Sequence, residues 1–170
     1  MKTALITGSG KNIGKAIALR LAKDGMNLVI HGGRNRDACE QTAREAESLG
    51  IQTHIAIGDL SKRTEVKRIS EEALNVFGRI DVLIHNAATR PHRNFFEIPD
   101  EEWDQVLEVN LGAAFQFCRL LVPGMLEQKW GRIITFAGIN AIRGYPNSPH
   151  VSVSKHGSWG LVKALSRDFA

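Results

Sequence analysis

The stretch TALITGSGKNIGKAIALRL, residues 3–21, decides the fold. An apolar run leads into a glycine-rich segment at residues 8–14, and a helical pattern of apolar residues follows. A strand, a glycine-rich turn and a helix in this order form a phosphate cradle. Glycines let the backbone approach the anion, and the N–H groups and positive dipole end of the helix bind it. The stretch predicts dinucleotide binding, with an ordinary strand-to-helix turn as the alternative.

The overall composition is typical of a globular protein that does not bind nucleic acid. The chain has 170 residues, of which 43% are hydrophobic and 24% charged, enough for one domain with a sizeable core. The formal net charge is +4, but Asp and Glu are interspersed among Lys and Arg, without a basic run or aromatic–basic interleaving. The mild positive excess suits an anionic cofactor or an acyl substrate.

The cysteines and the hydropathy pattern predict a cytoplasmic protein. Cys39 and Cys118 stand alone, without metal-ligand spacing, so we expect reduced thiols and no metal site. No apolar run reaches the length expected of a membrane span, and no signal peptide precedes the first strand. We therefore expect no membrane partner.

Short apolar runs alternate with amphipathic segments along the whole chain. Buried strands without polar alternation, separated by helices, predict an α/β fold with a parallel sheet and helices on both faces. The predicted strands are 3–7, 27–31, 53–57, 81–85 and 132–136. The predicted helices are 13–23, 36–49, 62–77, 101–128 and a last one from 149 or 150 to the end.

Residues at the predicted helix ends agree with this pattern. Ser61, Asp100 and Ser148 are predicted N-caps, and Pro149 follows the last of them. A glycine follows each of three helices, where a left-handed residue ends a helix at little cost: Gly25, Gly50 and Gly78.

Polar residues near the predicted strand ends are candidates for a nucleotide site. Asp59 follows the third strand. Its carboxylate either accepts a hydrogen bond from the amine of adenine or caps a turn. Asn86-Ala87-Ala88 follows the fourth strand, and its small residues permit close approach to a ribose. Asn110 lies inside an apolar helical stretch, as a buried amide, a kink or a site residue. Lys155 lies near the start of the last helix, against the dipole, where a structural and a functional role remain equally open.

Together these residues resemble the short-chain dehydrogenase/reductase family, of the type that includes 3-oxoacyl-acyl-carrier-protein reductases. Residues 7–14, TGSGKNIG, resemble the motif TGxxxGxG with Asn12 in place of its middle glycine, and HNAA at 85–88 stands where NNAG is usual. Gly131-Arg132-Ile133-Ile134 resembles the fifth strand, and Asn110 the active-site asparagine. The resemblance implies a Rossmann-type doubly wound parallel sheet and a single dinucleotide-binding domain over residues 1–170, incomplete at its C-terminus because the family's further strands are absent.

The charge around the second strand favours NADP(H) over NAD(H). The family's NAD-binding members carry an acid at the end of this strand for the ribose 2′-hydroxyl, whereas here Gly32-Gly33 leads to Arg34 and Arg36. Lys11 adds a cation beside the turn, so a 2′-phosphate meets positive charge. The predicted cofactor-binding residues are Gly8, Ser9, Lys11, Asn12, Ile13, Gly14, Arg34, Asp59, Leu60, Asn86, Ala87, Ala88 and Lys155.

Two catalytic positions of the resembled family are not filled by its usual residues. The family's tyrosine, four residues before the lysine, gives or takes the substrate proton, and a serine thirteen residues earlier polarises the carbonyl. Counting back from Lys155 gives Val151 and Gly138, and neither side chain performs these roles. We predict Asn110, Lys155 and His150 as the catalytic residues.

His150 is the preferred substitute because it adjoins position 151 and because imidazole titrates near neutrality. Neighbouring helix residues nevertheless point about 100° apart, so His150 does not share the face of Lys155. Tyr145, the only tyrosine, is the weaker alternative because it would need a displaced loop, and packing is its simpler role.

Two functions from different classes stay open. The first is an NAD(P)(H)-dependent oxidoreductase that interconverts a carbonyl and an alcohol of small-molecule size. The alternative is a catalytically silent nucleotide-binding member with a structural or regulatory role. In the family, the long helix and the last helix form subunit interfaces, so the resemblance implies a homodimer or homotetramer. Burial within one subunit is the other explanation of the apolar residues on these two helices. These residues are Phe115, Phe117, Leu120, Leu121, Trp159 and Leu161.

Overall fold

The computed structural model describes residues 1–169 and has a five-stranded parallel sheet at its centre. The strand order is β3-β2-β1-β4-β5, and all four pairings are parallel, which confirms the predicted Rossmann-type sheet. The order reverses between β1 and β4, so the carboxyl ends of these strands border the crevice in which such sheets bind ligands. The strands are β1 (Thr3–Thr7), β2 (Asn27–Gly32), β3 (Thr53–Ile57), β4 (Val82–His85) and β5 (Arg132–Thr135).

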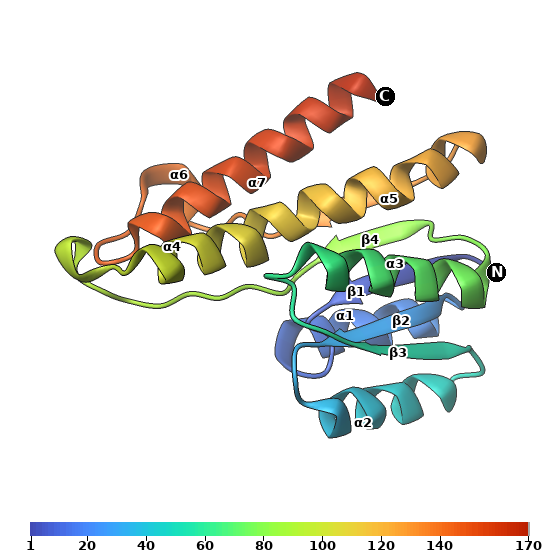
Figure 1. Ribbon diagram of the computed structural model, residues 1–170. Coiled ribbons are helices and arrows are strands. Elements are labelled where there is room, and N and C mark those ends of the chain that lie inside the picture. Colours follow the sequence, from blue (N-terminus) through green and yellow to red (C-terminus); the bar gives the residue numbers. More distant parts are fainter. Residues whose placement is uncertain (170) are drawn as a thin grey trace.

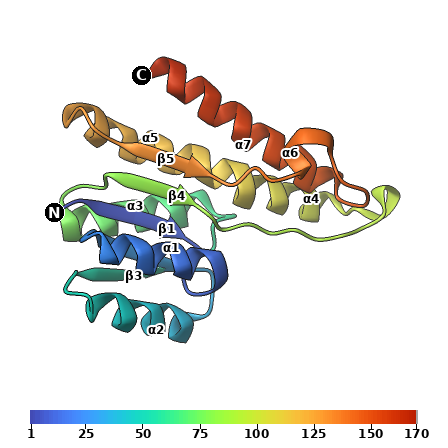
Figure 2. The ribbon, with the colours of Figure 1, turned by 180° about the vertical axis from the view of Figure 1, so that it is seen from behind.

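Helices cover both faces of the sheet (Figures 1 and 2). One face packs against α1 (Asn12–Lys23) and α2 (Arg36–Glu47), and the other against α3 (Arg63–Phe77) and α5 (Ala113–Glu127). The last helix, α7 (Pro149–Asp168), starts beside α4 and diverges from α5 toward its C-terminal end (Figure 1). This arrangement places the starts of α1 and α7 at the same edge of the sheet.

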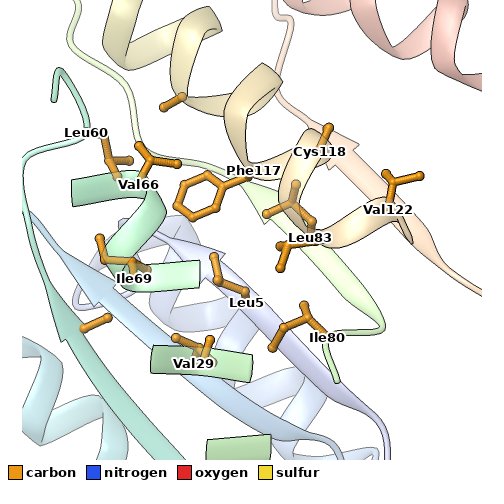
Figure 3. Close-up of a cluster of buried hydrophobic side chains, with 14 of the residues drawn as sticks. Leu5, Val29, Leu60, Val66, Ile69, Ile80, Leu83, Phe117, Cys118 and Val122 are labelled. Carbon is orange, nitrogen blue, oxygen red and sulfur yellow. The ribbon is translucent and has the colours of Figure 1, made fainter. Parts of the chain in front are cut away.

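The strands are apolar throughout because both sheet faces are buried. Leu5 and Val29 face α3 and α5, where the fully buried Phe117 fills the centre of the layer (Figure 3). Ile6 and Leu28 point the other way, toward α1 and α2. Burial of such side chains on both faces, about 1.5–3 kcal/mol each, fixes the strands that carry the site.

The predicted strands and helices all occur, with ends that differ by one or two residues. The fourth strand begins at Val82, one residue later than predicted, and the carboxylate of the preceding Asp81 accepts a hydrogen bond from the Thr3 N–H at 2.8 Å. Two short elements were not predicted, α6 (Asn140–Arg143) and a 3-10 turn (Phe95–Glu97), because neither is long enough to show a periodic pattern.

The predicted helix 101–128 is interrupted. It consists of α4 (Asp100–Leu107), a π-helical turn (Glu108–Gly112) and α5. The Val109 carbonyl oxygen lies 3.0 Å from His85 Nε2, and the Asn110 carbonyl accepts from the Ser158 hydroxyl at 3.0 Å. Side chains of other elements therefore bind carbonyl groups at the π-helical turn, where wider helical geometry is often associated with functional sites.

By length and composition alone, the combined helix Asp100–Glu127 passes as a membrane span, contrary to the expectation that no apolar run is long enough. Its apolar residues pack within the molecule, with Phe117 and Leu121 buried against the sheet and α3. The core helix of a soluble protein passes the same test, so this finding is weak evidence for a membrane.

The predicted helix ends are correct at some positions and wrong at others. Ser148 is the N-cap residue of α7, and the three predicted glycines all have positive φ. Ser61 is not an N-cap, because its hydroxyl donates to Asp59 Oδ1 and α3 starts later, after Lys62. Asp100 is likewise the first residue of α4 rather than its N-cap, which is Pro99.

Candidate functional site

The turn between β1 and α1 leaves no room for side chains at two glycines. Gly8 has a φ of 67°, in the left-handed region that favours glycine. A Cβ added at Gly14 would collide with the Gly8 carbonyl oxygen and would lie 2.7 Å from Asn86 Nδ2. The bare backbone of this turn and the start of α1 form a surface that fits a dinucleotide's phosphates.

Asn12 adopts a backbone conformation that is more usual for glycine. Its φ is 50°, and asparagine is one of the few residues with a side chain that tolerates this region. The substitution for the motif's middle glycine therefore preserves the turn. Lys11, the N-cap residue of α1, and Ile13 have exposed side chains on either side of Asn12.

A buried network joins the ends of β1 and β4. The Thr7 hydroxyl oxygen accepts from the N–H groups of Asn86 at 3.0 Å and Ala87 at 2.9 Å. The Asn86 side-chain amide donates to the carbonyl oxygens of Thr7 at 3.1 Å and Gly8 at 3.0 Å. Asn86 therefore clamps the glycine-rich turn, while Ala88, the third residue of the predicted segment, is exposed.

The side chains of Ser9, in the turn, and His31, on β2, hold the turn in place, and no sequence motif indicates the part of His31. Its Nδ1 accepts from the Gly8 N–H at 3.2 Å, and its Nε2 lies 3.0 Å from the Gly58 carbonyl oxygen. Burial lowers the pKa of His31 to about 4, so the ring is neutral, as an Nδ1 acceptor must be. The Ser9 hydroxyl donates to the Ile6 carbonyl and accepts from the His31 N–H, so this predicted cofactor ligand shapes the turn with its side chain.

The end of β2 carries cations and no acid. Arg34 and Arg36 are exposed, and residues 27–36 contain no Asp or Glu. Lys11 is exposed on the neighbouring turn. The electrostatics at this end of the sheet therefore favour an additional anionic group.

Asp59 and Leu60, the two candidate cofactor-binding residues that follow β3, have structural roles. Asp59 Oδ1 accepts from the Ser61 N–H at 3.0 Å and from its hydroxyl at 2.9 Å, which is the turn role of this residue. These hydrogen bonds, the backbone one foremost, lower the pKa of Asp59, and the nearby Lys62 and Arg34 add to the effect. The Leu60 side chain lies in the core against α3 (Figure 3).

Asn110 is fully buried in the π-helical turn, and both ends of its amide are bonded. Its Oδ1 accepts from the Thr89 N–H at 2.8 Å, and its Nδ2 donates to the Thr89 carbonyl and the Ser154 hydroxyl, each at 3.0 Å. Asn110 thus joins the loop after β4 to α7, and through Ser154 it lies next to Lys155.

Lys155 brings a buried amine to the same place. Its side chain is 8% exposed, and burial lowers its pKa to about 8, with a further effect from Arg90. His85, beneath it, has a pKa of about 4, lowered first by burial and then by the Lys155 charge. The structure therefore brings Asn110 and Lys155 together at the carboxyl end of β4.

A sequence profile of the short chain dehydrogenase family matches residues 2–170. The chain belongs to this family. It is 32% identical over 169 residues to 3-oxoacyl-[acyl-carrier-protein] reductase FabG of Staphylococcus epidermidis, covering 99% of this chain and 69% of that protein. It is 34% identical to D-beta-hydroxybutyrate dehydrogenase of Cupriavidus necator, covering 99% and 65%.

Solved structures agree with this assignment. A metagenomic short-chain oxidoreductase in complex with NADP superposes with a TM-score of 0.93 at 27% identity, covering 98% of this chain and 75% of that one. Acetoin dehydrogenase YohF from Salmonella typhimurium superposes with a TM-score of 0.94 at 28% identity, covering 98% and 66%. The predicted short-chain dehydrogenase family and its Rossmann-type fold are thus confirmed.

The two atypical positions of this short chain dehydrogenase lie in the first turn of α7, which contains Val151, and between β5 and α6, where Gly138 lies. Val151 is 2% exposed and lines a cavity of about 370 Å³, together with Tyr145. Gly138 has a φ of 72°, a conformation in which any side chain is strained. Neither position offers a group that transfers a proton.

The structure does not bring His150 to this cavity. The side chain is fully buried, and its Nε2 lies 3.4 Å from Glu102 Oε1 of α4. Glu102 is also bonded by both Arg93 Nε and Arg93 Nη2 at 2.9 Å. His150 is thus directed toward α4, whereas the next residue, Val151, lines the cavity.

Proposed function

We propose that this chain is an NADP(H)-dependent oxidoreductase that interconverts a carbonyl and an alcohol by hydride transfer. The observation that carries the proposal is the bare glycine turn at the start of α1, next to the exposed Lys11 and Arg34 and without an acid at the end of β2. A dinucleotide with a 2′-phosphate matches both features. The names of the two curated relatives and the NADP complex of a structural neighbour support the same chemistry.

Each retained site residue has a defined part in this proposal. The turn and Asn86 hold the pyrophosphate, and Arg34 and Lys11 face the 2′-phosphate. Lys155 binds the nicotinamide ribose, and Asn110 holds the start of α7 against the loop that follows β4. When bound, the reduced nicotinamide supplies the hydride.

The second candidate function is nucleotide binding without turnover. The observation that favours it is the absence of proton-transferring side chains at Val151 and Gly138. Loss of a positioned general acid costs roughly 10²–10⁴ in rate, so a dinucleotide bound here would chiefly stabilise the fold or an assembly.

We also propose a homodimer or homotetramer. Phe117 and Leu121 are buried within the subunit, which accounts for part of the apolar surface predicted at α5 and α7. Phe115 and Trp159 are 42% and 45% exposed, and they support an interface on these helices.

Titration of the 170-residue protein with NADPH and NADH, followed by nucleotide fluorescence, tests the proposal. We expect NADPH to bind more tightly, and Arg34→Glu to weaken NADPH by about tenfold or more, because a carboxylate then faces the 2′-phosphate. Arg167→Glu, an equally exposed charge reversal at the end of α7, is the control. Failure of both nucleotides to bind would refute the proposed function; binding without reduction of any carbonyl would favour the second candidate.

A further inference from the structure

The cavity beside Val151 contains a histidine that the family pattern does not use. Its lining residues come from the loop after β4, from α6, from the segment that leads into α7 and from the first turn of α7. They are Arg90, His92, Asn140, Tyr145, Ser148 and Val151. An imidazole and a phenol thus face the same space as the position from which the family's tyrosine is missing.

Ser148 holds the ring of His92 in a fixed orientation. The Ser148 hydroxyl oxygen lies 3.1 Å from His92 Nδ1, and the same oxygen lies 3.5 Å from the Pro91 carbonyl oxygen. Ser148 is 2% exposed, whereas the His92 ring is exposed to solvent, so the serine supports the ring from its buried side. Its side chain makes no capping bond to α7, which leaves the hydroxyl available to the imidazole.

This arrangement suits both protonation states of the ring. When His92 is neutral, the Ser148 hydroxyl donates to Nδ1, and the proton of the ring is on Nε2. When His92 is protonated, its Nδ1–H donates to the Ser148 oxygen, and the hydroxyl turns to the Pro91 carbonyl. A general acid needs such a support, because it must be held in place before and after it gives up its proton.

We propose that His92 is the general acid of this enzyme and that Ser148 is its positioning residue, an inference that rests on the proposed reductase function. The hydride and its electron pair pass from the bound reduced dinucleotide to the substrate carbonyl carbon. The carbonyl oxygen takes the proton from His92 Nε2, the N–H bond breaks and an O–H bond forms. The products are an alcohol and the oxidised dinucleotide, and the exposed imidazole recovers its proton from water.

The charges around the cavity favour this transfer. Arg90 lines the cavity, so its guanidinium offers positive charge to an alkoxide that develops there. Arg93, next to His92 in the chain, is bound to Glu102 of α4. Tyr145, from the loop before α7, packs edge-on against His92 with the ring centroids 5.9 Å apart.

His92 fits the role better than the two residues considered from sequence. His150 is fully buried beside Glu102, with neither ring nitrogen hydrogen-bonded, and it does not line the cavity. Tyr145 lines the cavity, but a phenol is a much weaker acid than an imidazolium and is therefore the poorer proton donor.

The test compares the full chain with His92→Gln, which retains polar contacts but cannot transfer a proton. His54→Gln, on β3 and remote from the cavity, is the matched control. For each protein, NADPH affinity is measured by fluorescence. Reduction of a 3-oxoacyl thioester and of acetoin, and oxidation of 3-hydroxybutyrate, are followed from about pH 5.5 to about 9.

We expect His92→Gln to lower kcat about 100-fold or more and to remove the limb of the pH profile near neutrality, with NADPH affinity unchanged. Ser148→Ala is expected to shift that limb and to lower kcat less, which a purely structural role would not do. If His92→Gln has the same kcat and pH profile as the parent protein, the proposal is overturned. It is also overturned if the parent protein binds NADPH but converts none of the three compounds. A parent that binds no nucleotide would overturn the proposed function as well.

Discussion

At the scale of single residues, Val151 is the position where one substitution should supply the proton donor that the family normally carries. It lies four residues before Lys155, so its side chain and the lysine lie on the same face of α7. Val151→Tyr would extend a phenol into the adjoining cavity, where the Lys155 charge lowers its pKa. In the His92→Gln background, which lacks the proposed general acid, we expect Val151→Tyr to raise kcat for carbonyl reduction by about 10², measured with saturating NADPH.

The control for this substitution is Val153→Tyr, which adds the same side chain on the exposed face of α7. An equal rise in both variants, or none in Val151→Tyr, would contradict the role assigned to position 151. We would not add Gly138→Ser, because the φ of 72° at this glycine strains any side chain, at a cost of about 1–2 kcal/mol.

At the scale of elements, the π-helical turn depends on the buried amide of Asn110. Asn110→Leu would remove the partners of the Thr89 N–H and carbonyl groups. Each buried polar group left unpaired costs about 1–3 kcal/mol, so we expect a loss of free energy of unfolding in that range or above, measured by urea denaturation. Gln105→Leu, on the exposed face of α4, should stay within about 0.5 kcal/mol of the parent.

The same turn marks the limit of what the sequence predicts about the elements. The strands are predicted from runs of apolar residues. The ends of three helices are predicted from the left-handed conformation of the glycines that follow them, Gly25, Gly50 and Gly78. Both signals are local in the sequence. The π-helical turn is set by His85 and Ser158, which reach it from other parts of the chain. No local pattern encodes such contacts, and a continuous helix was predicted instead.

The candidate site likewise contains residues that motif spacing predicts and contacts that depend on packing between distant elements. The glycine turn, Asn110 and Lys155 were predicted because motif spacing identifies them, and the structure brings them to one edge of the sheet. The orientation of His150 toward Glu102 and the contact of His92 with Ser148 depend on how α4, α7 and the loop after β4 pack. Adjacency in sequence favoured His150, whereas the packing favours His92.

At the scale of the whole molecule, two buried histidines make the fold sensitive to acid. Burial lowers the pKa of His31 and His85 to about 4 in the folded protein, whereas the unfolded chain titrates near pH 6.5. Between these values the unfolded state binds more protons than the folded state. Stability is therefore complete above about pH 6.5 and falls as the pH decreases toward 4, by about 3 kcal/mol for each histidine.

His85→Asn isolates one of these contributions. The asparagine Oδ1 can accept from the Thr7 hydroxyl in place of His85 Nδ1, and the amide does not titrate. We expect the urea midpoint of the variant to fall less steeply than that of the parent between pH 6.5 and 4, while His54→Gln follows the parent. Parallel curves for His85→Asn and the parent would mean that His85 protonates in the folded state as readily as in the unfolded chain. In that case the tie between β4 and the π-helical turn would not depend on a neutral imidazole.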